Sequence, residues 1–338
     1  MELSERKQAI LAAVVRDYVH TGEPVGSKML CDTLGGLSSA TIRNEMSDLV
    51  DMGYLEQPHT SAGRVPTIKA YRLYIDALMQ AAELPLSEQA AIARAIAEGG
   101  ADVEQTLAAA GAVLAGITGC AAITTAETDA ATKIHGIELM PMGLHSGLIV
   151  LVTSAGVVSS KLCRFSTALT PHTVELFMRL AHDVLVGTEL ASFNPASIQT
   201  LIASLGDNGL ELVPIVSALG SLIEQSGRSQ LHVQGQANLL GYREISPVKA
   251  RQIFDLFTHD EEIISLLNRP RGVHGVIFGS ETCFDALDTS SLVVSRYRLG
   301  DGTHTGYIGV IGPIRMNYDR VIPSIGFVTD LLGSINTN

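Results

Sequence analysis

The stretch from Gln57 to Ile75 contains no Asp or Glu, although the chain of 338 residues has a formal net charge of −12. It carries Arg64, Lys69 and Arg72 among Pro, His, Ser and Gly residues. A loop that lies against phosphate groups must lack carboxylates, which the phosphates would repel, while Arg and hydroxyl side chains donate hydrogen bonds to them. These residue types therefore indicate a surface for a nucleic acid.

The segment before this loop has the pattern of an amphipathic helix that begins at Ser38 or Ser39. One face is apolar and consists of Ile42, Met46, Leu49 and Val50. The opposite face, in the first two turns, holds Ala40, Thr41, Arg43 and Asn44. Arg pairs with guanine, Asn pairs with adenine, and an Ala or Thr methyl contacts the thymine methyl. The first turns of this helix are therefore predicted to contact base edges in the major groove.

The first eighty residues supply the elements that would position these side chains. Ser4 begins a predicted helix that Gly22 ends, and a short helix follows Gly26-Ser27. After the amphipathic helix, two short strands flank the sequence PHTSAG, and a further helix begins at Thr67. Helix, short helix, helix and hairpin is the order of a winged helix-turn-helix.

The remaining sequence predicts an α+β multidomain protein. We expect a winged helix-turn-helix at 1–80, a linking helix at 81–102, and one α+β domain formed by 103–165 and 230–338. Three helical patterns fill residues 166–229, which lie between the two parts of that domain. We therefore interpret 166–229 as a helical insertion.

Other candidate sites favour structural explanations. The four cysteines and ten histidines lack the spacing of a zinc site, and no catalytic set can be assembled. Gly306, Gly309 and Gly312 follow a G-x-x-G-x-x-G pattern with no helix after it, so they are predicted to be strand or turn glycines. The acids in HDEE at 259–262 fit the start of a helix without a metal. We expect no cofactor and no enzyme activity.

The mean hydropathy of +0.26 raises the question of a membrane segment. The best candidate, Gln105 to Ala126, is uncharged but consists mostly of Ala, Gly and Thr, which gain little from transfer into lipid. The N-terminus has no signal-peptide pattern. We therefore expect a cytoplasmic protein without a membrane partner.

Two long motifs give a resemblance to a known family. The sequence SSATIRNEMSDLVDMGYLEQPHTSAGRVPT, followed by AYRLYID, closely resembles the heat-inducible transcription repressors of the HrcA family. The C-terminal SLVVSRYRLGDGTHTGYIGVIGPIRMNYDRVIPSIGFV resembles the closing segment of the same family. The resemblance implies a winged helix, a GAF-like domain and a dimerising domain inserted into it. It also implies repression of chaperone operons through an inverted-repeat double-stranded DNA operator, with activity dependent on a GroE-type chaperonin.

The resemblance assigns the base-reading helix to the segment around Ser39, Thr41, Arg43 and Asn44, and the wing to His59, Thr60, Ser61, Gly63 and Arg64. Ala40 from the helical face, with Thr67 and Lys69 from the acid-free stretch, completes the predicted DNA-binding set. The sequence departs from the family pattern at Ser39, Ile68 and Ala70. These departures concern the fine position of the wing.

A homodimer is expected because one winged helix covers only one half-site. The resemblance places its interface in 166–229, where the predicted dimerisation residues are Val174, Phe177, Met178, Leu185, Leu201, Ile202 and Leu205. One alternative is a metabolite-responsive regulator whose GAF-like domain binds a small molecule. A third hypothesis, an enzyme fused to a DNA-binding domain, has no catalytic residues in its favour.

Overall fold

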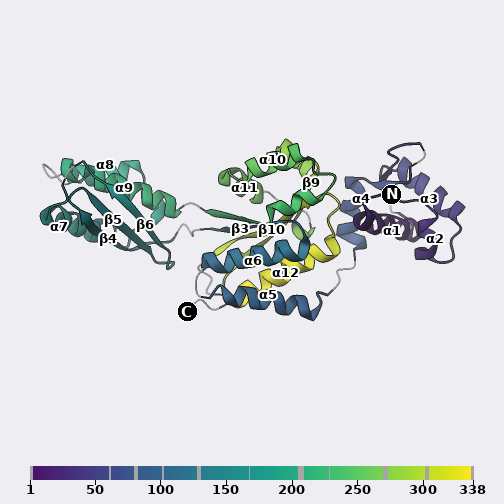
Figure 1. Ribbon diagram of the computed structural model, residues 1–338, viewed down its shortest axis with the longest axis horizontal. Coiled ribbons are helices and arrows are strands. Elements are labelled where there is room, and N and C mark those ends of the chain that lie inside the picture. Colours follow the sequence, from purple (N-terminus) through teal and green to yellow (C-terminus); the bar gives the residue numbers. More distant parts are fainter. Residues whose placement is uncertain are drawn as a thin grey trace. The chain divides into compact units, whose positions relative to one another are not determined.

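The computed structural model describes residues 3–60, 62–79, 83–100, 103–127, 131–166, 168–204, 209–227, 229–268, 273–300 and 304–335. The chain divides into two compact units (Figure 1). The first unit comprises residues 1–125, 231–300 and 306–338, and the second comprises residues 126–230 and 301–305. Both units contain helices and strands, so the predicted α+β multidomain class is confirmed.

The first unit begins with a winged helix-turn-helix. Its elements are α1 (Glu5–Thr21), α2 (Met29–Leu34), α3 (Ser39–Asp51), β1 (Leu55–Glu56), β2 (Val65–Pro66) and α4 (Ile68–Leu73), which continues as a π-helical turn (Tyr74–Leu78). Ser4 begins α1 because its hydroxyl accepts a hydrogen bond from the backbone N–H of Lys7. Gly22 ends α1 at a φ of 68°, in the left-handed region. The element order predicted from the sequence is confirmed.

A five-stranded sheet forms the rest of the first unit, in the order β7-β3-β10-β9-β8. Its strands are β3 (Ala121–Ala126), β7 (Gln230–Gln234), β8 (Val276–Phe278), β9 (Ser290–Arg298) and β10 (Thr305–Pro313). Helices α10 (Pro247–Leu256) and α11 (Asp260–Leu267) cover one face (Figure 1). Helices α6 (Val103–Thr118) and α12 (Tyr318–Ser334) lie on the other face of the sheet. Helix α5 (Leu86–Glu98) packs against α6 and α12. The predicted linking helix at 81–102 is thus part of this unit.

The glycine motif and the acidic cluster have the structural roles that the sequence predicted. A Cβ atom at Gly306 would lie 2.0 Å from the Thr125 carbonyl oxygen, and one at Gly309 would lie 2.6 Å from that of Val293. These glycines of β10 therefore allow close approach of neighbouring backbone. In the HDEE sequence, the second residue, Asp260, begins α11. Among the described residues, no cluster of His, Cys, Asp and Glu could hold a metal ion. No helix in the described ranges has the length and apolar character needed to span a bilayer.

The second unit is a three-stranded antiparallel sheet in the order β4-β5-β6, with helices over one face (Figure 1). The strands are β4 (Ile134–Gly143), β5 (Ser146–Thr153) and β6 (Val158–Arg164), and the helices are α7 (Pro171–Leu180), α8 (Pro195–Ser204) and α9 (Gly209–Gly227). Every second residue of β5 is buried, as expected for a strand with one covered face. Ile149 and Leu151 of β5 share one buried cluster with Phe177 of α7 and Leu219 of α9.

The boundary predicted for the inserted domain differs from this division. The sequence assigns β4, β5 and β6 to the domain of 103–165, whereas the structure places them in a unit that begins at residue 126. The reason is that the buried face of these strands packs against α7 and α9. Hydrophobic periodicity identifies a strand but does not say which helices will cover it.

The residues predicted for dimerisation lie largely in the interior of the second unit. Phe177 and Leu185 are 0% and 4% exposed and belong to its buried cluster. Three others are partly buried and pack against the same cluster: Val174, Met178 and Ile202. The side chain of Leu201, in α8, and the whole of Leu205 are outside the described part of the chain. Phe177 and Leu185 therefore belong to the interior of their own unit, and their place in a dimer interface stays a prediction.

The apolar surface of this unit lies on the other side of the sheet, which we call the outer face of β4-β5-β6. Met140, Leu148 and Leu162 are direct neighbours in register across the three strands. Met140 is 44% exposed and Leu162 is 66% exposed. Val152 and Val158 form a second apolar pair on the same face, and Val158 is 65% exposed. Glu138 and Ser160 pair with Val150 between these two groups, so the face also carries polar residues. Exposed apolar residues gathered on one face mark an interaction site more often than isolated apolar residues do.

Replacing Phe177 by Ala is expected to destabilise the second unit by about 3–5 kcal/mol, because loss of the fully buried ring would leave a cavity in the core. Val184, which is 47% exposed in the same unit, provides the matched control, and Val184→Ala should change stability by less than about 0.5 kcal/mol. Chemical denaturation of both variants measures the difference. Equal stabilities would contradict an interior position for Phe177.

Candidate nucleic-acid interface

Helix α3 presents the predicted base-reading residues on its free face. The Ser38 hydroxyl accepts a hydrogen bond from the backbone N–H of Thr41 (3.1 Å), which fixes the start of the helix. Its apolar face is buried and consists of Ile42, Met46 and Leu49. Ala40, Arg43 and Asn44 are all exposed. The amphipathic pattern therefore located the exposed face correctly.

Two of the predicted base-reading residues have their hydroxyls in hydrogen bonds within the protein. The Ser39 hydroxyl lies 3.0 Å from that of Ser27, a buried residue in the turn before α2. The Thr41 hydroxyl lies 2.9 Å from that of Ser38. Ser39 thus links the start of α3 to the turn before α2, and its contact with bases stays a prediction.

The wing is a short hairpin whose tip is held by a side chain. The amide of Gln57 donates to the carbonyl oxygens of Thr60 (2.9 Å) and Ala62 (3.1 Å), which closes the loop. His59 and Thr60 are exposed at its tip, and Ser61 lies outside the described residues. Gln57 is a functional residue that the sequence did not single out. No motif marks it, because its two acceptors are backbone atoms.

The base of the wing packs closely against the segment before α2. A Cβ atom at Gly63 would lie 2.4 Å from the carbonyl oxygen of Val25, so this position requires glycine. Arg64 exchanges two backbone hydrogen bonds with Val25, of 2.8 and 2.9 Å. Within the described structure its buried Nε has no hydrogen-bond partner, and Nη1 makes one long contact of 3.5 Å to Ala62. The half-buried guanidinium therefore keeps donors available for a ligand.

A helix-turn-helix with an exposed reading face and an acid-free wing is the arrangement of a DNA-binding domain. The family model of the HrcA winged helix-turn-helix DNA-binding domain, a transcription repressor domain, matches residues 2–78. The model of the HrcA C-terminal domain matches residues 104–322. The chain belongs to the HrcA family.

Curated relatives support this membership over nearly the whole chain. The heat-inducible transcription repressor HrcA of Syntrophobacter fumaroxidans is 35% identical, with 99% of this chain and 97% of the relative covered. That of Caulobacter vibrioides is 35% identical over 98% and 94% of the two chains, and that of Acetivibrio thermocellus is 32% identical over 97% and 95%. A crystal structure of a hypothetical protein, 23% identical and covering 98% of both chains, shares the fold with a TM-score of 0.65.

The family match favours the repressor over the metabolite-responsive alternative that the sequence left open. This HrcA-family chain is a heat-inducible transcription repressor with a winged-helix DNA-binding domain, and it is not an enzyme. The GAF-like character of the C-terminal domain remains a prediction.

Two acids on α3, Glu45 and Asp48, are paired with cations from α1. Lys7 Nζ forms ion pairs with Glu45 and with Asp48, the latter at 2.7 Å, and Arg6 lies 3.5 Å from Glu45. The hydrogen bonds that Lys7 donates to Asp48 and Glu45 raise its pKa, so it stays charged at neutral pH. An acidic recognition helix would otherwise repel DNA. No local sequence pattern predicts this contact, because Lys7 and Glu45 lie on different helices.

Thr67 and Lys69, two further residues of the predicted DNA-binding set, also make contacts within the protein. The Thr67 hydroxyl donates toward the Gly53 and Tyr54 carbonyl oxygens (2.9 and 3.0 Å) and caps α4. Lys69 Nζ donates to the Met52 carbonyl oxygen (2.9 Å) and lies 4.2 Å from the centre of the Tyr54 ring. Both residues hold the end of α3 against the start of α4.

Lys28 adds an exposed cation that the predicted set omits. It occupies the position before α2, next to the buried Ser27. The first turn of a helix that crosses the DNA backbone commonly donates to phosphates. A lone Lys in a turn carries no distinctive sequence signal, so only the fold identifies it.

Replacing Lys7 by Met should weaken binding to all DNA sequences by roughly threefold to tenfold at low salt, because Glu45 and Asp48 would lose their main counter-charge. Fluorescence anisotropy with a random duplex at several salt concentrations measures the change, which should shrink as salt rises.

Arg179→Met is the matched control, since it removes one cation of an exposed pair with Glu175 in the second unit. It alters the net charge equally but should leave DNA affinity nearly unchanged. Equal losses in the two variants would show that total charge, and not the local pairing on α3, determines the effect.

Proposed function

We propose that this HrcA-family protein represses chaperone operons by binding an inverted-repeat operator as a homodimer, with one winged helix on each half-site. A GroE-type chaperonin is proposed to set its activity, on the basis of the family resemblance. A protein with this role works on the chromosome, so the proposal places it in the cytoplasm.

The observation that carries the proposal is the free face of α3. Asn44 and Arg43 are exposed on its first two turns, where a recognition helix meets base edges. Beside them, the wing offers the exposed His59 and Thr60 and the incompletely paired guanidinium of Arg64. In this proposal Asn44 and Arg43 read bases, Ala40 contacts a base methyl, and Arg64 and Lys28 hold phosphates.

The outer face of β4-β5-β6 supports a homodimer and suggests where it forms. The helices of the second unit direct most of their apolar residues into its core, whereas Met140, Val158 and Leu162 remain exposed. In an isologous dimer the same apolar patch meets itself, so one such face suffices. We therefore move the proposed dimer interface from the buried residues of 166–229 to this sheet face.

Asn44→Ala should cost roughly 1–3 kcal/mol of binding free energy on the operator and much less on random DNA, because a base contact is lost. The operator is the duplex that wild-type protein selects from a randomised pool, and binding is measured by anisotropy. Arg64→Ala provides the contrast, since loss of a phosphate contact should weaken both duplexes alike and lower the salt slope by about one per half-site. The base-reading role fails if Asn44→Ala weakens both duplexes equally.

Leu162→Glu should convert the dimer into a monomer, because it places a charge beside Leu148 on the apolar part of the sheet face. Operator affinity should then fall by about 10²–10⁴, the gain that tethering a second half-site module provides. Light scattering gives the mass, and anisotropy gives the affinity.

Val184→Glu is the control, because Val184 is an exposed apolar residue on the helical side of the same unit. It should remain dimeric. A Leu162→Glu protein that stays dimeric would exclude the sheet face as the interface.

A further inference from the structure

The winged helix is attached to the rest of the first unit by two arginines from opposite directions. Arg72, in α4, extends from the winged helix toward β8, whereas Arg315 extends from the loop between β10 and α12 toward α1. Neither residue belongs to the reading face of α3 or to the wing. We call the contacts around them the α4 joint and the α1 joint.

The α4 joint combines charge, hydrogen bonds and aromatic packing. Arg72 Nη2 lies 2.6 Å from both carboxylate oxygens of Glu281, and Nη1 donates to the Val276 carbonyl oxygen at 3.0 Å. The guanidinium lies 4.6 Å from the centre of the Phe278 ring. The carboxylate of Glu281 also accepts from the backbone N–H of Phe278 (2.9 Å). Such a multiply bonded pair is directional, so it fixes an orientation as well as a distance.

Beside this pair, Tyr71 of α4 is buried against two aromatic rings from the five-stranded-sheet part of the first unit. Its ring centre lies 6.3 Å from that of Phe278 and 6.0 Å from that of Tyr318. One turn later, Tyr74 donates to Asp319 at the start of α12 (2.6 Å). Burial, with the hydrogen bond to Asp319, raises the pKa of Tyr74 to about 12, so this donor is present at all physiological pH values.

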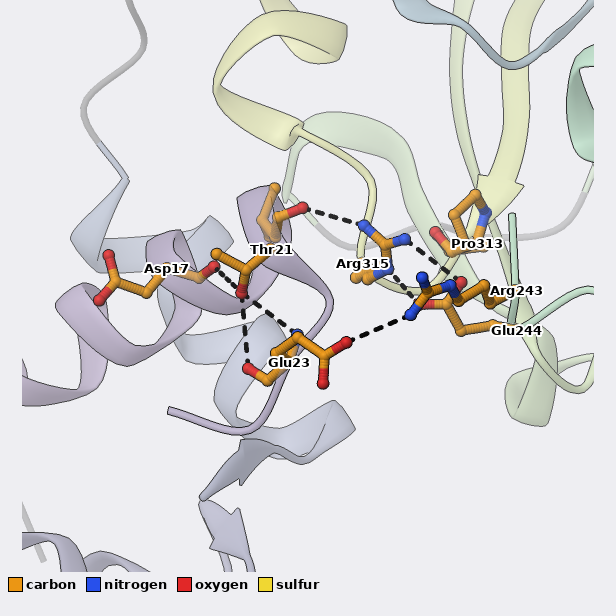
Figure 2. Close-up of polar contacts among 9 residues, drawn as sticks. Asp17, Thr21, Glu23, Arg243, Glu244, Pro313 and Arg315 are labelled. Carbon is orange, nitrogen blue, oxygen red and sulfur yellow. Dashed lines mark hydrogen bonds and ion pairs between the residues drawn. The ribbon is translucent and has the colours of Figure 1, made fainter. Parts of the chain in front are cut away.

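The α1 joint closes the other side (Figure 2). Arg315 forms a two-point ion pair with Glu244 and donates from Nη1 to the Val19 carbonyl oxygen at 3.1 Å. That carbonyl belongs to the last turn of α1, where the helix dipole favours a cation. Gly22 allows the approach, because a Cβ atom there would lie 3.1 Å from Arg315 Cζ. The nearby pair of Arg243 and Glu23 is fully at the surface and adds little.

From this geometry we propose that Arg72 with Glu281 and Arg315 with Glu244 are positioning residues that make the spacing between half-sites a determinant of operator choice. The inference rests on the proposed homodimer on an inverted repeat. The two joints hold each recognition helix at one angle to the sheet of its own first unit. Recognition helices that cannot swivel on their own protomers fit fewer spacings, because each added base pair rotates the second half-site by roughly 34° and moves it along the helix axis. Two loosely attached winged helices would adjust to several spacings.

The experiment compares the selected operator with versions lengthened by two base pairs between the half-sites, and with a duplex that carries one half-site. Wild-type protein should lose at least about tenfold in affinity on the lengthened operator, a part of the gain of about 10²–10⁴ from the second half-site, because the second module can no longer bind without strain. Glu281→Arg faces Arg72 with a like charge, and Glu244→Arg does the same to Arg315. Each variant should show a clearly smaller loss on the lengthened operator, with unchanged affinity for the single half-site.

Glu88→Arg is the matched control. It reverses the charge of a pair with Arg320 (2.6 Å) that joins α5 to α12 and does not involve the winged helix. It should keep the wild-type response to spacing. Restoring opposite charges in the double variant Arg72→Glu, Glu281→Arg should recover part of that response, which a general loss of stability would not do.

The outcomes separate this inference from the proposed function. If wild-type protein binds the palindrome no better than one half-site, the proposed dimeric function fails, and the inference fails with it. If it binds the palindrome better at both spacings equally, the function stands and the inference alone is overturned. The inference is also overturned if both charge-reversed variants keep the wild-type loss on the lengthened operator.

Discussion

The repulsion between an acidic protein and a polyanion is the constraint on which this structure depends. The chain has a formal net charge of −12, and charges interact over a Debye length of roughly 8 Å at physiological salt. The DNA-binding surface must therefore be made locally neutral or basic. The chain achieves this in two ways, by excluding acids from the wing and by pairing Glu45 and Asp48 on α3 with Lys7.

The same constraint explains why the proposed dimer would matter more here than in a basic protein. Few cations remain to hold each winged helix on DNA, so a dimer would gain its affinity from two half-sites bound together. That requirement gives the second unit its proposed purpose. It uses one face of a sheet to bury its own core and leaves the other face, around Leu162, available to a second copy.

The sequence predicted the parts of this structure that depend on local order. The winged helix follows from caps and periodicity within short segments, so its elements and the free face around Asn44 were identified correctly. The predicted domain boundary differs from the division into compact units, because that division depends on which helices cover β4, β5 and β6. Phe177 lies in the interior for a related reason, since an amphipathic pattern shows that a face is buried but not by which partner. Contacts such as Arg315 with Val19 join residues almost 300 positions apart, and no pattern in a single sequence connects them.

The distribution of cations in the winged helix also affects how the protein would select its DNA. The chain has 23 Lys and Arg residues, and several of those in or near the winged helix are committed to contacts within the protein. Lys7 neutralises α3, Lys69 holds its end, and Arg72 attaches α4 to the sheet. Each of these forgoes a phosphate contact, and each fixes the position of the reading face. A repressor built in this way should bind random DNA weakly, because few free cations make the sequence-independent phosphate term small. In the proposed dimer, selectivity would then depend on orientation, since an operator that matches both reading faces at once would best offset the repulsion from the acidic body.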